Sequence, residues 1–146
     1  MSIDARGQAL QDRLVESMPR MRELCSGESP ELFRSLMSRA GDKWTLLVIG
    51  VLGNDRQRFT EIADMIPGIS RRMLTVTLRA LERDGLVTRT VYAQVPPRVE
   101  YEVTDLGHSL QRVAFTVGEW VGEHQHVIAG NRRRFDDAAA PAPESA

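Results

Sequence analysis

The sequence predicts an α+β fold that is mainly α-helical, and the spacing of apolar residues leads to this prediction. Apolar residues recur at helical spacing through most of the chain but alternate with a period of two between about Leu86 and Val103. Two short helical segments, joined by Pro67-Gly68-Ile69, precede this alternating region. A helix-turn-helix followed by a two-stranded hairpin is the element order of a winged helix-turn-helix, which we predict for residues 41–104.

The first 40 residues predict helices outside that compact unit. A stripe of apolar residues at helical spacing covers about residues 9–24 and is interrupted by Pro19. A second helix is expected from about Glu31 to Arg39, because Ser29-Pro30 supplies an N-cap and a first-turn proline. We assign residues 1–40 to helices that contribute to dimerisation.

Residues 41–104 predict a buried helix, a helix-turn-helix and a hairpin with a stiff tip. The first helix follows the N-cap residue Asp42 and is apolar almost all round, as expected of a central core helix. The tip contains Pro96-Pro97, which cannot continue a strand ladder. In chain order we expect a helix from about Lys43 to Leu52, a short strand at Arg58-Phe59, helices Thr60 to Ile66 and Arg71 to Asp84, and strands Leu86 to Tyr92 and Arg98 to Val103.

The C-terminal part predicts one long helix and a tail. The helix follows the N-cap residue Thr104, extends from about Asp105 to Ile128 and carries an apolar face along its length. Because such a face must be buried, we assign residues 105–130 to dimerisation together with the N-terminal helices. Residues 131–146, which end in a segment rich in alanine and proline, are expected to be a disordered tail.

The composition argues against several classes of protein. No stretch is apolar enough to cross a bilayer and the N-terminus lacks an apolar signal segment, so we expect a cytoplasmic protein without a membrane partner. A single cysteine excludes an internal disulfide, and His108, His124 and His126 lack the spacing of a zinc site. With no phosphate loop or catalytic constellation, we expect no enzyme, no metal and no cofactor.

The net charge of −1 conceals an uneven distribution of charge. Between Arg56 and Arg98 there are eight arginines and only four acidic residues, so this segment is +4 and the remainder is −5. Positive charge gathered on one element is the electrostatic mark of nucleic-acid binding. By itself the charge leaves two interpretations open, a DNA-binding face or a solvated surface.

A helical wheel for residues 71–84 separates a core face from a basic face. Leu74, Leu78 and Leu81 share one side, and the opposite side carries long donors for guanine and phosphate beside small residues that allow close approach to DNA. The hairpin that follows favours DNA over exposed arginines in water, although Arg98 has the alternative role of an ion-pair partner across the strands. The predicted DNA-binding residues are Ser70, Arg71, Arg72, Thr75, Val76, Arg79 and Arg83, with Gln94 and Arg98 in the wing.

Several sequence blocks resemble the HxlR-type regulators over about residues 41–120. They include Gly41-Asp42-Lys43-Trp44-Thr45, Arg58-Phe59-Thr60-Glu61-Ile62, Leu81-Glu82-Arg83-Asp84-Gly85-Leu86-Val87 and Val95-Pro96-Pro97-Arg98. The resemblance implies a MarR-like winged-helix homodimer that binds a pseudo-palindromic operator in double-stranded DNA as a repressor or activator. It maps the DNA-reading helix onto residues 70–84 and the wing onto residues 92–98.

The resemblance also raises the question of a signal. Family members sense electrophiles or oxidants through a cysteine, but that position falls near Glu31 here, and Cys25 lies before an apparent insertion. Two interpretations of Cys25 remain open: a redox sensor whose pKa is lowered by Arg20 and Arg22, or a small buried residue. Similarly, Phe115, Trp120 and His124 either line a pocket for a small-molecule effector or serve in packing.

One alternative to DNA binding is a winged helix used only for protein interaction. In that case the exposed arginines would meet an acidic partner protein instead of DNA. A second alternative, an enzyme, lacks any supporting constellation of residues.

Overall fold

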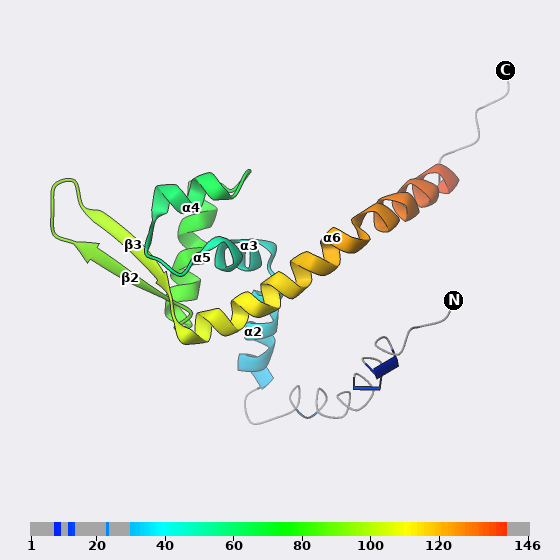
Figure 1. The fold of residues 1–146 in the computed structure, drawn as a ribbon, viewed down its shortest axis with the longest axis horizontal. Coiled ribbons are helices and arrows are strands. Elements are labelled where there is room, and N and C mark those ends of the chain that lie inside the picture. The colour runs from blue at the N-terminus through cyan, green and yellow to red at the C-terminus, as the bar shows by residue number, and fades with distance from the viewer. Residues whose placement is uncertain (1–7, 10–11, 14–22, 24–29, 140–146) are drawn as a thin grey trace, which may run out of the picture. The chain divides into compact units, whose positions relative to one another are not determined.

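The computed structural model of the chain describes residues 8–9, 12–13, 23 and 30–139 (Figure 1). The chain divides into two units, the first up to residue 45 and the second from residue 46. Most of the predicted helix over residues 9–24 lies outside the described residues. The elements are α2 (Pro30–Gly41), α3 (Lys43–Val51), β1 (Gln57–Arg58), α4 (Phe59–Met65), α5 (Arg71–Arg83), β2 (Val87–Tyr92), β3 (Arg98–Val103) and α6 (Asp105–Ala139). Within the described part of the chain, no helix is long and apolar enough to cross a membrane.

The predicted cap of α3 is present in the first unit. The Thr45 amide and hydroxyl both donate to Asp42 Oδ2, at 2.9 and 3.0 Å. The first of these bonds satisfies a backbone amide at the helix start that would otherwise lack a partner. Next to the cap, the Lys43 ammonium lies 4.6 Å from the centroid of the Trp44 ring.

The core of the second unit joins the helix-turn-helix to the sheet. Its largest fully buried side chains come from α3, α4, α5 and β2, together with the residue that follows α3: Val48, Ile49, Leu52, Ile62, Leu74, Leu78, Leu81 and Val87. Between α4 and α5 the chain reverses at Pro67-Gly68, where Gly68 adopts a φ of 84° that disfavours any side chain. One face of α5 is buried in this core, and its opposite face remains exposed.

The three strands form an antiparallel sheet in the order β1-β3-β2. Tyr92 pairs with Arg98 next to the loop that closes the hairpin, and β1 adds to the other edge of β3, with Arg58 opposite Glu100. The predicted strand at Arg58-Phe59 is wrong by one residue. Phe59 begins α4, because the Glu61 carboxylate accepts the Arg58 amide at 2.6 Å and so stabilises a helix start there.

Helix α6 is attached to the second unit at its N-terminal end. Its cap residue, Thr104, donates its hydroxyl to the Gly85 carbonyl at 2.7 Å and accepts the Gly107 amide at 3.1 Å. Further along, the buried Gln111 amide donates to the carbonyls of Ile49, at 2.8 Å, and Leu52. These carbonyls lie at the end of α3, where backbone acceptors lack helical partners.

The prediction that α6 ends near Ile128 and is followed by a disordered tail from residue 131 was wrong. The helix continues to Ala139, and residues 140–146 lie outside the described residues. Low hydrophobicity suggested disorder, but arginine and alanine are strong helix formers and no proline occurs between Asp105 and Pro141. Helix propensity and apolar content are separate properties, and helix propensity determines where α6 ends.

Candidate nucleic-acid interface

Helix α5 presents its predicted reading residues on an exposed face. The opposite face contributes four buried side chains, Leu74, Thr77, Leu78 and Leu81, of which Thr77 was missed in the sequence analysis. Such a division leaves long cationic side chains beside short ones over one side of the helix, which suits entry into a major groove. The exposed residues are Arg71, Arg72, Thr75, Val76, Arg79 and Arg83, with Val76 53% accessible.

The start of α5 is fixed by hydrogen bonds and by a neighbouring aromatic ring. Ser70 accepts the Met73 amide at 3.0 Å through its hydroxyl oxygen, so this hydroxyl keeps its proton for another acceptor. The Thr75 hydroxyl donates to the Arg71 carbonyl at 2.8 Å. The Arg71 guanidinium lies 6.0 Å from the centroid of the Phe59 ring, so α5 begins next to the first residue of α4.

The wing residue Arg98 is held at the loop end of the hairpin, where β3 begins. Its guanidinium lies 4.2 Å from the centroid of the Tyr92 ring, and its Nε atom is 3.2 Å from a carboxylate oxygen of Glu100. The acid is therefore two residues along the same strand, whereas the residue opposite Arg98 is Tyr92. Gln94, in the connection between the strands, is exposed.

Arg56 makes a further contact to the wing that the sequence analysis did not anticipate. Its Nε donates to Glu102 Oε2 at 3.0 Å and its Nη1 to the Tyr92 hydroxyl at 2.7 Å. The Glu102 hydrogen bond, and then that to Tyr92, raise the pKa of the already basic Arg56. Arg56 thus ties the segment before β1 to both strands of the hairpin.

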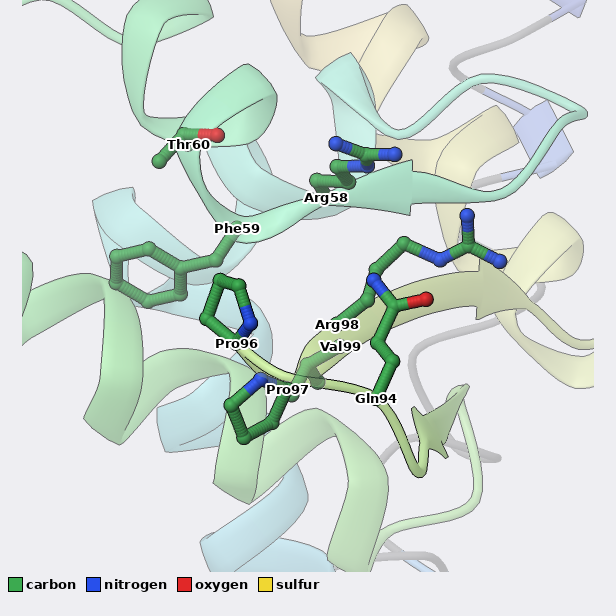
Figure 2. Close-up of a pocket in the computed structure, with 8 residues that line it drawn as sticks. All are labelled: Arg58, Phe59, Thr60, Gln94, Pro96, Pro97, Arg98 and Val99. Carbon is green, nitrogen blue, oxygen red and sulfur yellow. The ribbon is translucent and has the colours of Figure 1, made fainter.

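A cleft of about 290 Å³ lies between the wing and the junction of β1 with α4. Figure 2 shows the polar ends of Arg58, Gln94 and Arg98 on one side and the rings of Phe59, Pro96 and Pro97 on the other. The structure thereby brings together two predicted residues, Gln94 and Arg98, with Arg58, which was not predicted. The basic segment included Arg58, but only the pairing of β1 with β3 places it beside the wing.

A second hollow lies between the latter part of α3 and α6. It measures about 550 Å³ and is mainly apolar, with Leu47, Val51, Ala114 and Phe115 among its lining residues and Glu119 at its edge. Of the proposed effector residues, Phe115 lines this hollow, whereas Trp120 stacks on His124 with 4.9 Å between ring centroids. Trp120 and His124 are both exposed on α6, so their role stays a prediction.

Two further predictions concern metals and the cysteine. Among the described residues, no three His, Cys, Asp or Glu side chains gather as metal ligands. Cys25 lies outside the described residues, so its role as a redox sensor stays a prediction.

Comparisons with known proteins agree with this geometry. Residues 40–129 match the family described as HxlR-like helix-turn-helix. An uncharacterized HTH-type transcriptional regulator of Methanothermobacter thermautotrophicus is 46% identical over 92 residues, covering 61% of this chain and 70% of that protein.

Two solved structures are similar in both sequence and fold. The redox regulator HypR in its reduced form is 36% identical with a TM-score of 0.60, covering 66% of this chain and 96% of HypR. The reduced form of the transcriptional regulator YodB from Bacillus subtilis is also 36% identical, with a TM-score of 0.53, covering 62% of this chain and 89% of YodB.

Proposed function

The chain belongs to the HxlR-like helix-turn-helix family of DNA-binding transcriptional regulators, and we propose that it acts as a homodimer that reads duplex DNA through α5. The exposed face of α5 carries this proposal, because Arg72 and Arg79 flank the small residues Thr75 and Val76 opposite a buried leucine face. Such a face combines donors for guanine and phosphate with room for close approach to base edges. In this proposal the protein acts by binding alone, without catalysis or a cofactor.

The wing supplies the second part of the proposed contact. A hairpin beside a recognition helix can reach the neighbouring minor groove or its phosphates. Gln94 is exposed in the connection and Arg98 stands at its base, so both fit a supporting role in positioning the protein. In this proposal, the residues of α5 recognise the base sequence.

The proposed homodimer uses the apolar face of α6. This helix leaves Val113, Val117, Trp120 and Val121 between 42% and 54% exposed, beside the apolar hollow against α3. A second copy would remove these side chains from water, with a favourable free energy of roughly 25 cal/mol per Å² of apolar surface. Because a two-fold dimer presents two identical reading helices, the proposed operator is pseudo-palindromic.

Single alanine substitutions at Arg72 and Arg79 test the reading face. We expect each substitution to weaken binding to a duplex selected from random sequences, by about 1–3 kcal/mol for a lost contact to guanine, and to relax preference at one base position. Arg112→Ala, which removes an exposed arginine from α6, is the matched control and should bind like the wild type. Fluorescence anisotropy over a range of salt concentrations measures the affinities.

The same titration distinguishes the alternative of a winged helix that binds only proteins. A DNA-binding face predicts an affinity for duplex that falls steeply as salt rises. If Arg72→Ala and Arg79→Ala both bound duplex like the wild type, α5 would not be the reading helix. If the wild type bound no duplex at all, the protein-interaction alternative would replace the present proposal.

A response to a signal stays a hypothesis. HypR is described as a redox regulator, and this description applies to HypR. For the present chain, oxidation of Cys25 or an effector bound in the hollow between α3 and α6 would be the corresponding mechanism.

A further inference from the structure

The cleft between the wing and the β1–α4 junction, defined above by Arg58, Gln94 and Arg98, is not part of the reading face of α5. Its polar residues come from both edges of β3, through Arg58 in β1 and Gln94 after β2. Arg58 lies opposite Glu100 on the neighbouring strand, and Glu100 is two residues from Arg98 on β3. All three side chains therefore project from the same face of the sheet. The sheet therefore concentrates two guanidinium groups at one place.

The two guanidinium groups at this place differ in their ion-pair partners. Glu100 is the acid beside Arg98, at 3.2 Å, and its side chain is only 15% exposed, whereas Arg58 is exposed and forms no ion pair with a carboxylate of the described residues. The Glu61 carboxylate accepts the Arg58 backbone amide at 2.6 Å but forms no ion pair with the Arg58 guanidinium, so this guanidinium is available to an anion at the cleft. Gln94 and Thr60 add neutral donors to its lining. This chemistry suits a group with a single negative charge and several acceptor oxygens.

The position of the cleft identifies the source of such a group. Arg71, at the start of α5, lies against Phe59, which lines the cleft, and Pro96 and Pro97 of the wing line it as well. If α5 occupies a major groove and the wing approaches the adjacent minor groove, the sugar-phosphate backbone between the two grooves must pass between these elements. A phosphodiester there would face the cleft.

We propose that this cleft binds a phosphodiester of the DNA backbone, with Arg58 as its main cation and Gln94 and Thr60 as neutral donors. The inference rests on the proposed function and adds Arg58 and Thr60 to the predicted DNA-binding residues. The apolar side, formed by Phe59, Pro96 and Pro97, limits access of water to the phosphate and so strengthens its attraction to Arg58. The contact fixes the register of the protein on DNA and carries no sequence information.

The salt dependence of duplex binding tests this contact in the full-length protein. For Arg58→Gln we expect the slope of log affinity against log salt to decrease in magnitude by about 0.9, the value for one neutralised phosphate, with unchanged base preference. Arg58→Lys keeps the charge and should keep most of the slope. Ethylation of one backbone phosphate should interfere with the wild type and have no effect on Arg58→Gln.

The control is Arg89→Gln, which removes an exposed arginine of the same sheet that does not line the cleft. An unchanged slope in Arg58→Gln, or an equal decrease in Arg89→Gln, would overturn the cleft contact and leave the role of α5 intact. Failure of the wild type to bind duplex would instead contradict the proposed function. Circular dichroism of each variant separates these outcomes from loss of folding.

Discussion

Gly107 lies in the first turn of α6, and its lack of a side chain lets this helix approach the end of the preceding sheet closely. A Cβ atom at this position would lie 2.0 Å from the Leu86 carbonyl oxygen and 2.6 Å from Val103 Cγ1. The same carbonyl accepts the Thr104 amide at 3.1 Å. Because the obstructing atom belongs to the backbone, a side chain cannot be accommodated by a change of rotamer.

We therefore expect Gly107→Ala to lower the free energy of unfolding by about 2 kcal/mol or more, as is typical of overpacking. Urea denaturation followed by circular dichroism measures this change. Gly122→Ala is the control, because nothing lies within 4 Å of its added methyl group, and alanine in a helix is favoured over glycine by up to about 1 kcal/mol. Equal stability of Gly107→Ala and the wild type would contradict the close approach.

At the scale of single elements, the wing depends on the pair that closes its hairpin. The Tyr92 ring lies under the Arg98 guanidinium and its hydroxyl accepts from Arg56, so one side chain joins both strands to the segment before β1. Each of these contacts is partly or fully exposed, and such contacts stabilise a protein only modestly. The expected consequence is local order of the wing, with little effect on overall stability.

Substitutions at Tyr92 separate its two contacts. Tyr92→Phe keeps the ring under Arg98 and loses only the hydrogen bond from Arg56, whereas Tyr92→Leu loses both. We expect amide hydrogen exchange in the wing to be about two- to five-fold faster in Tyr92→Leu than in Tyr92→Phe, which corresponds to an exposed cation–π contact of about 0.5–1 kcal/mol. Indistinguishable exchange in the two variants would show that the ring does not hold Arg98.

At the scale of the whole molecule, charge and apolar surface are separated along the chain. Positive charge gathers between Arg56 and Arg98, whereas α6 exposes several large apolar side chains, among them Val113, Val117, Trp120 and Val121. Exposed apolar side chains that gather on one helix indicate an interaction surface. Reading DNA and assembling the dimer are therefore proposed to use different elements.

Val117→Glu tests the dimer, because Val117 is 42% exposed and its substitution leaves the described core intact. We expect a shift from dimer to monomer in analytical ultracentrifugation, together with an affinity for a two-half-site duplex at least about ten-fold lower, since a monomer engages one half-site. Gln125→Glu adds the same charge at another exposed position of α6. A dimer of unchanged mass in Val117→Glu would exclude this face as the interface.

The sequence by itself determined the order of helices and strands, the exposed face of α5 and the caps at Asp42, Ser70 and Thr104. These features depend on periodicity and on hydrogen bonds between residues three or four apart, which neighbours in the sequence encode. It failed at the end of α6, where apolar content was an unsuitable guide to a helix formed by arginine and alanine.

Only the tertiary structure decided which distant residues meet. The pairing of β1 with β3 brings Arg58 to the wing, Gly107 meets the Leu86 carbonyl, and Gln111 donates to the Ile49 carbonyl 62 residues away. Local patterns do not contain these contacts, because each depends on how separate elements pack around a common core. The winged helix-turn-helix was therefore predictable, whereas the phosphate cleft proposed beside it was not.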